Sequence, residues 1–164
     1  MKLLLKLPLL ALLATLAFAC STDGIEDNVE SIELKITSLE AKNIEVEILE
    51  LINNHRSSMG LNSLNSLSVV KSVAYTHTDY MVENNTVSHD NFFTRSNYLK
   101  ANAGAKKVSE NVAYGYSSAE SVVKAWLKSA SHKANLEGDY TNFDISVEEN
   151  AEGKLYFTNI FVKI

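Results

Sequence analysis

The 164-residue sequence contains one cysteine, one proline and six glycines. A single cysteine excludes an intrachain disulfide, a zinc ribbon and a CxxC redox site. The scarcity of proline and glycine excludes collagen-like and proline-rich chains, and 46% hydrophobic with 21% charged residues is typical of ordinary globular proteins. A chain of this length is expected to form one domain that buries roughly two-thirds of its unfolded surface, so that packing alone can stabilise it.

The N-terminus has no apolar run as long as the roughly 20 residues that span a bilayer. Lys2 and Lys6 precede a shorter apolar run, residues 7–19, and this order is typical of a secretory signal peptide. The run ends in small residues followed by Cys20, which resembles a bacterial lipobox. We therefore expect a signal peptide at residues 1–19 and a lipid attached to Cys20. Ordinary cleavage near the same place is the alternative.

Basic residues are in deficit, since 15 Lys and Arg stand against 20 Asp and Glu, a net charge of −5. Removal of residues 1–19 takes away two lysines and lowers the net charge by two, to −7. This balance argues against a nucleic-acid partner and against binding to an anionic membrane surface, which both require a basic patch. Membrane contact would come through the N-terminal lipid, and stable anchoring requires more than one acyl chain. Residues 20–42 are rich in Asp, Glu, Ser and Thr, and we expect an acidic tether there.

After the tether the hydrophobic pattern becomes helical. Apolar residues recur at spacings of three and four over residues 44–55, and Gly60 is suited to end that helix. A second helix is predicted over about residues 66–84, with His77 on its apolar stripe as a packed core or boundary histidine. A third helix is predicted from a capping box at residues 117–120. Its expected buried face comprises Val122, Val123, Trp126, Leu127 and Ala130.

The C-terminal segment changes to the period-two alternation of a strand. Apolar residues alternate with polar ones over residues 143–148, and residues 155–164 are rich in aromatic and β-branched side chains. The turn-forming residues 149–153 between them predict an antiparallel hairpin. A further short strand is predicted at residues 110–114. Helices before and between strands indicate an α+β domain whose sheet is covered by helices.

Three short polar stretches contain the candidate functional residues His89, Glu110 and His132. Each stretch lies in a loop or at the end of an element beside an apolar anchor, where binding groups commonly sit on a rigid scaffold. Two imidazoles and a carboxylate suit a divalent metal such as zinc, with one coordination position left open. They equally suit an acid–base set in which Glu110 orients one histidine. Taken alone, the residues leave a third interpretation open, in which they are partly exposed polar side chains that cap backbone groups.

Six segments of the chain form an ordered set of motifs. They are Leu51 to Leu61, Ala74 to Met81, Ser88-His89 with Phe92 and Arg95, Glu110 to Ala113, Val122 to Asn135, and Tyr156 to Phe161. In this order they resemble the bacterial branch of the CAP superfamily, which comprises cysteine-rich secretory proteins, antigen five and pathogenesis-related proteins and is also called SCP-like. No single segment is unique to the family, but six in the correct order are jointly specific.

The resemblance implies a three-layer α-β-α sandwich over residues 43–164, with a small antiparallel sheet that ends in the C-terminal hairpin. It also implies a cleft lined by His89, Glu110 and His132. Many eukaryotic relatives line this cleft with two histidines and two glutamates and can bind a divalent cation. No convincing second glutamate is found here, so the resemblance implies at most a modest affinity for zinc.

Three functional hypotheses follow. The first is a lipid-anchored domain of the bacterial envelope, outside the cytoplasm, that binds a small apolar or lipid ligand or an envelope component. The second is a metal-assisted or acid–base hydrolase of peptides or cell-wall polymers, for which the sequence contains no firm nucleophile. The third is a structural or adhesive surface protein. Equal turnover after substitution of His89 or Glu110 would remove the second, the third predicts that binding to cells survives those substitutions, and a lipid-binding screen tests the first.

Overall fold

The computed structural model describes residues 41–164. The sequence predictions for the signal peptide, for Cys20 and for the tether up to residue 40 lie outside these residues. Within the described part the elements are α1 (Asn43–Ser58), β1 (Asn65–Ser66), α2 (Ser68–Glu83), α3 (Phe92–Ala103), β2 (Lys107–Tyr114), α4 (Ala119–Lys128), α5 (Ala130–Leu136), β3 (Asn142–Glu149) and β4 (Leu155–Lys163). No helix within residues 41–164 combines the length and the apolar character that crossing a membrane requires.

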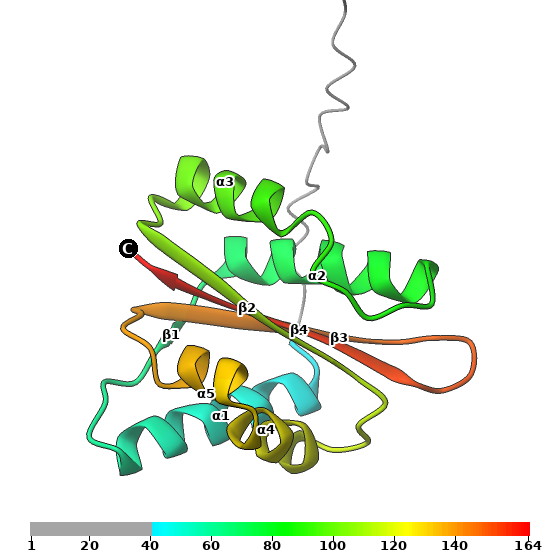
Figure 1. The fold of residues 1–164 in the computed structure, drawn as a ribbon, viewed down its shortest axis with the longest axis horizontal. Helices are drawn as coiled ribbons and strands as arrows, with labels where there is room; N and C mark the ends of the chain where they lie inside the picture. Colours follow the sequence, from blue (N-terminus) through cyan, green and yellow to red (C-terminus); the bar gives the residue numbers. More distant parts are fainter. Residues whose placement is uncertain (1–40) are drawn as a thin grey trace, which may run out of the picture. The chain divides into compact units, whose positions relative to one another are not determined.

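The domain is a three-layer α-β-α sandwich of the α+β class, as predicted (Figure 1). Its strands form one sheet in the order β1-β3-β4-β2. Helices α2 and α3 cover one face of this sheet, and α1, α4 and α5 cover the other. The sheet is mixed rather than wholly antiparallel, because the two-residue strand β1 pairs in parallel with the start of β3. The remaining pairs, β3 with β4 and β4 with β2, are antiparallel.

The inner strand β4 is buried on both faces and divides the apolar core in two. Phe157 and Phe161 belong to the core under α1 and α4, whereas Ile160 and Val162 belong to the core under α2 and α3. Successive side chains of a strand point to opposite faces, so odd and even positions of β4 supply different cores. A strand covered by helices on both faces needs apolar residues at nearly every position. This requirement explains why the aromatic and β-branched C-terminal run lies inside the sheet.

The first two predicted helices are confirmed as α1 and α2. Gly60 follows α1 with a φ of 71°, a left-handed conformation that glycine adopts without steric cost. The Leu61 N–H then donates to the Arg56 carbonyl at 2.9 Å, which closes the helix in a Schellman-type arrangement. His77 is 2% exposed on the inner side of α2, so its prediction as a packed histidine is also confirmed.

The third predicted helix is in fact two helices. α4 ends at Lys128, and Ser129 has extended backbone angles, φ −94° and ψ 122°, before α5 begins. The capping box starts one residue later than predicted, with Ser118 Oγ accepting from the Ser121 N–H at 3.2 Å. Ala130 is exposed, contrary to the prediction, because the break at Ser129 ends the stripe that α4 buries.

Helix α3 was missed by the sequence prediction, which placed its first residues in a loop. Its fully buried positions are only Ser96 and Leu99, so it lacks the wide apolar stripe of a typical surface helix. The helix is preceded by Asn91 with a φ of 58°, a conformation that asparagine tolerates better than most residues. A short turn after His89 therefore starts a helix that periodicity alone does not indicate.

The predicted strands are confirmed with one change in length. The strand predicted at residues 110–114 begins earlier, at Lys107, and the hairpin of β3 and β4 pairs Glu149 with Leu155 across its turn. Asp144 and Ser146 are buried although polar, because helices cover the sheet face to which they point.

Candidate functional site

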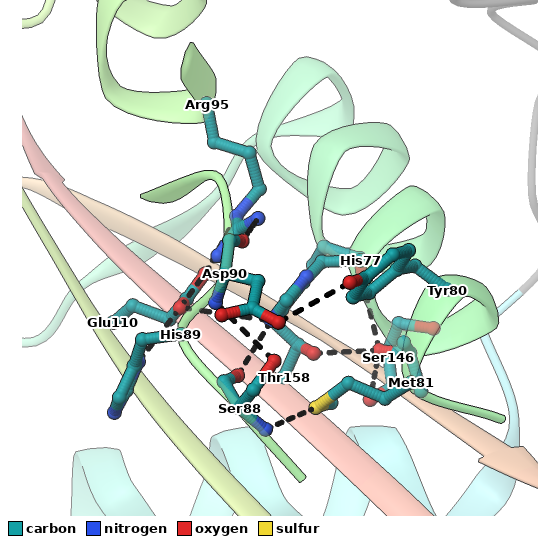
Figure 2. A network of polar contacts seen from close by, with 12 residues as sticks. His77, Tyr80, Met81, Ser88, His89, Asp90, Arg95, Glu110, Ser146 and Thr158 are labelled. Atoms are coloured by element: carbon teal, nitrogen blue, oxygen red, sulfur yellow. Dashed lines mark hydrogen bonds and ion pairs between the residues drawn. The ribbon is translucent and has the colours of Figure 1, made fainter. Parts of the chain in front are cut away.

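The structure places His89 and Glu110 in direct contact (Figure 2). His89 lies in the loop between α2 and α3, and Glu110 lies in the middle of β2. The His89 Nδ1 atom is 2.9 Å from Glu110 Oε1. The His89 side chain is 53% exposed, whereas that of Glu110 is 1% exposed. A buried carboxylate therefore holds one nitrogen of a surface imidazole and leaves the Nε2 edge of the ring open to a ligand.

The loop that carries His89 is fixed by contacts with α2. His77 Nε2 lies 2.8 Å from the Ser88 carbonyl oxygen, and the Ser88 N–H donates to Met81 Sδ at 3.5 Å. A carbonyl oxygen can only accept, so Nε2 of His77 carries the proton in this contact. Since both contacts precede His89 directly, the buried face of α2 determines where the exposed imidazole lies.

Arg95 of α3 makes the strongest contact with Glu110. Its Nε atom donates to Glu110 Oε2 and its Nη2 atom to Oε1, both at 2.8 Å, and its Nη1 atom donates to the Asp90 carbonyl at 2.6 Å. Bidentate guanidinium–carboxylate pairs of this kind fix geometry as well as charge. Arg95 thus ties the start of α3 and the loop that carries His89 to β2.

Glu110 is ionised at neutral pH. Burial by itself raises the pKa of Glu110, but the hydrogen bonds from His89 and Arg95, together with the charge of Arg95, outweigh burial and hold that pKa below its usual 4.5. His77 Nε2 lies 3.9 Å from Glu110 Oε1. Burial lowers the pKa of His77 despite the attraction of Glu110, so this imidazole is neutral. Glu110 can therefore orient His89, but it has no proton to donate.

His132 lies in the same groove as His89 without contacting Glu110. Its ring makes no hydrogen bond with any other residue of the range 41–164, and its place is set by its backbone. Asn111 Nδ2 donates to the His132 carbonyl at 3.1 Å, and Asn135 Nδ2 donates to Asn111 Oδ1 at 2.8 Å. These amide contacts hold α5 against β2. Burial, together with a smaller electrostatic contribution from nearby His89, lowers the pKa of His132 below 6.5, which favours the neutral ring.

A groove of about 570 Å³ lies beside the end of β2, between the loop before His89 and the junction of α4 with α5. Its polar lining includes His89 and His132. Its apolar lining consists of Val87, Val112, Ala113, Tyr114, Tyr116, Ala125 and Trp126. Largely apolar walls with a few polar groups are typical of ligand sites. A smaller hollow of about 270 Å³ lies along the same strand and shares His89. A third hollow of about 600 Å³, between α1 and β3, contains no candidate residue.

The three candidate ligands do not form a metal centre in this arrangement. Both carboxylate oxygens of Glu110 accept from Arg95, and a cation on them would be repelled by the guanidinium. Within the described part of the chain, no three His, Cys, Asp or Glu side chains are placed to hold a metal ion together. Zinc binding by His89, Glu110 and His132 stays a prediction, and the donor set does not fit it.

Residues 49–162 match the sequence profile of the cysteine-rich secretory protein family, CAP. This match covers most of the chain. The chain belongs to the CAP family. Its six ordered motifs and its sandwich fold agree with this membership, as the sequence resemblance predicted.

The similar proteins that follow are all from bacteria. An uncharacterized membrane protein, YlbC of Bacillus subtilis, is 32% identical over 123 residues, which cover 73% of this chain but only 34% of the relative. The chain therefore spans about a third of the length of that curated relative. Among solved structures, an outer surface protein of Borrelia burgdorferi has a TM-score of 0.68 at 25% identity, covering 76% of this chain and 96% of the other.

Two further structures are similar. An extracellular protein of Bacillus anthracis that contains an SCP domain has a TM-score of 0.64 at 27% identity, covering 73% of this chain and 40% of that protein. A cysteine-rich secretory protein of Staphylococcus aureus has a TM-score of 0.64 at 21% identity, over 78% of this chain and 43% of that protein, and supports the fold alone.

Sequence reasoning found the residues of this CAP site but not their partners. It paired Glu110 with one histidine, and the contact between His89 and Glu110 agrees with that pairing. It gave no functional role to Arg95, and it assigned His77 to packing alone. The available signal was a glutamate inside a strand with a valine two residues to either side, on the same face. A carboxylate buried there requires a cation or several donors. The sequence does not tell which arginine supplies them, since Arg95 belongs to the unpredicted helix α3.

Proposed function

We propose that this protein is a lipid-anchored CAP-domain protein of the bacterial envelope that binds a ligand with an apolar part in the groove between His89 and His132. The observation that carries the proposal is the groove itself, with apolar walls and two imidazoles at its surface. Its walls come from a loop, a strand and a helix junction that buried contacts hold in place. A groove formed before binding loses little conformational entropy when a ligand enters.

An envelope location is supported from two sides. The relatives include an outer surface protein and an extracellular protein by their names. In the sequence, Cys20 directly follows an apolar run of signal-peptide length. We infer that acylated Cys20 anchors the domain to a membrane and that the acidic residues up to 42 separate the domain from that surface.

Tryptophan fluorescence tests the binding site directly, because Trp126 is the one tryptophan in the sequence and lines the groove. Titration of the full-length protein in detergent with palmitate, as a simple apolar probe, should give a saturable change in emission. Ala125→Leu fills the groove and should weaken binding at least tenfold. Ala130→Leu, on the exposed side of α5, is the matched control and should leave binding within twofold. Absence of saturable binding, or equal loss in both variants, contradicts the groove as an apolar ligand site.

The anchor is tested separately in cells. The wild-type protein should fractionate with membranes and incorporate labelled palmitate, whereas Cys20→Ser should lose both properties without changing the thermal unfolding of the domain. Incorporation of label into Cys20→Ser, or release of the wild-type protein into the soluble fraction, would remove lipid anchoring from the proposal.

A second candidate function is an acid–base hydrolase of peptides or cell-wall polymers. The contact that favours it is the hydrogen bond between His89 Nδ1 and the buried anion Glu110, which orients an exposed imidazole. The neutral imidazole of His132 in the same groove supplies a potential base. In this role His89 Nε2 would transfer a proton to or from the substrate, and Glu110 would keep the ring in place.

Turnover of peptidoglycan fragments and of unstructured peptides by wild type, His89→Gln and Glu110→Gln decides between the two functions. A hydrolase requires a fall of at least a hundredfold in both variants. Equal rates in all three proteins exclude the hydrolase. If adhesion to cells persists unchanged in the same variants and in Ala125→Leu, the structural or adhesive hypothesis replaces both.

A further inference from the structure

The outer edge of β2 carries backbone N–H and C=O groups, and the rest of the described chain supplies hydrogen-bond partners for only some of them. The Gly115 N–H donates to the Leu155 carbonyl at 2.9 Å, and this pair fixes the phase of the β2–β4 ladder. In an antiparallel pair alternate residues bond to the partner strand and the others point away. Odd-numbered residues of β2 therefore bond to β4. The even-numbered residues, among them Glu110, Val112 and Tyr114, direct their N–H and C=O groups to the outer edge.

Two carbonyl groups of this edge have a neutral side-chain donor. Asn135 Nδ2 donates to the Glu110 carbonyl at 3.3 Å, and Trp126 Nε1 donates to the Val112 carbonyl at 3.2 Å. By this alternation the N–H groups of Val112 and Tyr114 point away from β4, and no side chain or loop carbonyl within residues 41–164 accepts from them. A carbonyl oxygen has two lone pairs, so the Val112 carbonyl can accept a second hydrogen bond.

The same edge forms the floor of the groove. Val112, Ala113 and Tyr114 line the groove of about 570 Å³, and the hollow of about 270 Å³ continues along Val108 to Glu110. The groove is therefore elongated along a strand whose free N–H groups repeat every second residue. Tyr114 is 40% exposed, so the end of this edge is accessible. An apolar small molecule uses the walls of such a groove but leaves the repeating N–H donors without partners.

We propose that the occupant of the groove is an extended polypeptide segment that adds to the sheet as a strand beside β2. This proposal rests on the proposed function, because it names the ligand class of the same groove. Main-chain hydrogen bonds to Val112 and Tyr114 supply affinity for any extended chain, and alternate side chains of the segment supply selectivity. One set of side chains faces Val87 and the loop before His89, and the other faces Ala125 and Trp126, so apolar residues are favoured at the centre.

The experiment uses the full-length protein in detergent and a pool of acetylated, amidated heptapeptides in which valine or phenylalanine alternates with threonine. Binding is followed by Trp126 fluorescence, and amide hydrogen exchange of Val112 and Tyr114 is measured by NMR with and without the tightest peptide of the pool. We expect at least tenfold slower exchange at both amides, because each becomes a hydrogen-bond donor in the complex. Palmitate, bound in the same groove, should leave both amides unprotected.

Two matched sets of variants separate strand addition from side-chain binding. Val112→Pro removes one outward N–H without removing a bond of the β2–β4 ladder, and it should lose at least tenfold more affinity for the peptide than Val112→Ala, which keeps the N–H. In the peptide, methylation of alternate backbone nitrogens in one register should weaken binding at least tenfold, and methylation in the other register should weaken it less than threefold. The peptide set and the exchange measurement stand without the proline variant if that variant does not fold.

The outcomes separate this inference from the proposed function. Palmitate binding without peptide binding overturns strand addition and leaves the groove as an apolar ligand site. Peptide binding without amide protection, or with equal loss in both methylation registers, also overturns strand addition. Failure of both probes to bind overturns the proposed function and this inference together.

Discussion

The two-residue strand β1 pairs only with the start of β3, so the rest of β3 forms one edge of the sheet and β2 forms the other. The two edges differ in how their backbone groups are satisfied. On the β3 edge, charged side chains supply partners for the outward groups. Glu45 Oε1 accepts from the Val147 N–H at 2.8 Å, Lys42 Nζ donates to the Val147 carbonyl at 2.6 Å, and Lys71 Nζ donates to the Ile145 carbonyl at 2.7 Å. Glu45 and Lys71 also pair with each other at 2.5 Å, with side chains 1% and 10% exposed.

The β2 edge has neutral donors on two carbonyls and no described acceptor for the N–H groups of Val112 and Tyr114. An unpaired edge is a template for another strand, and proteins usually block it with charge or cover. This domain pairs the outward groups of the edge that faces away from His89 with charged side chains, and leaves two N–H groups unpaired at the edge that forms the floor of the groove. The β2 edge, which has unpaired N–H groups, therefore coincides with the candidate site. The β3 edge, which lies away from that site, is protected by charged side chains.

The largest effect is expected from removal of the carboxylate that covers the β3 edge. Glu45→Ala leaves Lys71 as an uncompensated buried charge and the Val147 N–H without an acceptor, so it should lower the free energy of unfolding by about 3–5 kcal/mol. Glu50→Ala, an exposed position on the same helix, should change it by less than about 0.5 kcal/mol. Urea unfolding at pH 7 measures both. Similar values for the two variants would show that Glu45 is not needed to cover the edge.

A proline comparison measures the two edges on the same scale. Val147 and Val112 both direct their N–H groups outward, but only that of Val147 is bonded to a buried side chain. The loss in the free energy of unfolding is measured for Val147→Pro and Val112→Pro, and the loss seen in Val147→Ala and Val112→Ala is subtracted from each. The remaining loss should be about 2 kcal/mol larger for Val147→Pro than for Val112→Pro. Equal costs in thermal or urea unfolding would mean that the edges are equally protected.

Buried carboxylates near the two edges should respond to pH with opposite signs. The pKa of Glu110 lies below 4.5, since hydrogen bonds from His89 and Arg95 exceed the effect of burial. Its contribution to stability is present above pH 4.5 and is lost as the pH falls through the lowered pKa. The stability difference between wild type and Glu110→Gln should therefore shrink on acidification below pH 4.5.

Asp144, near the β3 edge, has the reverse behaviour. Burial raises its pKa above 3.8 in spite of hydrogen bonds from Ser66 and Ile145. Its contribution is present below pH 3.8 and is lost as the pH rises through the raised pKa, so Asp144→Asn should gain stability relative to wild type over that range. Unfolding curves at intervals between pH 3 and pH 6 test both signs, and slopes of the same sign would contradict the assignment.

The smallest effect on stability is expected at His132. Its ring has no hydrogen bond to another residue within 41–164, so His132→Ala should change the free energy of unfolding by about 0.5 kcal/mol or less. Binding of palmitate in the groove should weaken nonetheless, because the ring forms part of the wall. A large loss of stability in calorimetry would instead assign His132 to the structure rather than to the site.

Local signals in the sequence predicted much of the fold. The helical stripes of α1 and α2, Gly60 after α1 and the C-terminal hairpin depend on near neighbours in the chain, so period and turn residues were sufficient. Helix α3 was not predicted because few of its side chains are buried. The break at Ser129 was not predicted because the polar pattern continues through it. The candidate residues were found by motif order, and of their contacts only the pairing of Glu110 with one histidine was anticipated.

The amino-acid sequence alone was sufficient to predict the family, the α+β layers and the presence of His89, Glu110 and His132 on one small domain. The folded chain was needed to show that Arg95 holds both oxygens of Glu110, that His132 stands apart, and that the β3 edge is covered while the β2 edge is not. Distance along the chain explains this division. Glu45 and Val147 are 102 positions apart, and Arg95 and Glu110 are 15 positions apart across a helix and a strand. A buried charge must be paired, and its partner comes within contact distance only when the layers pack. Local sequence patterns therefore do not reveal such pairs.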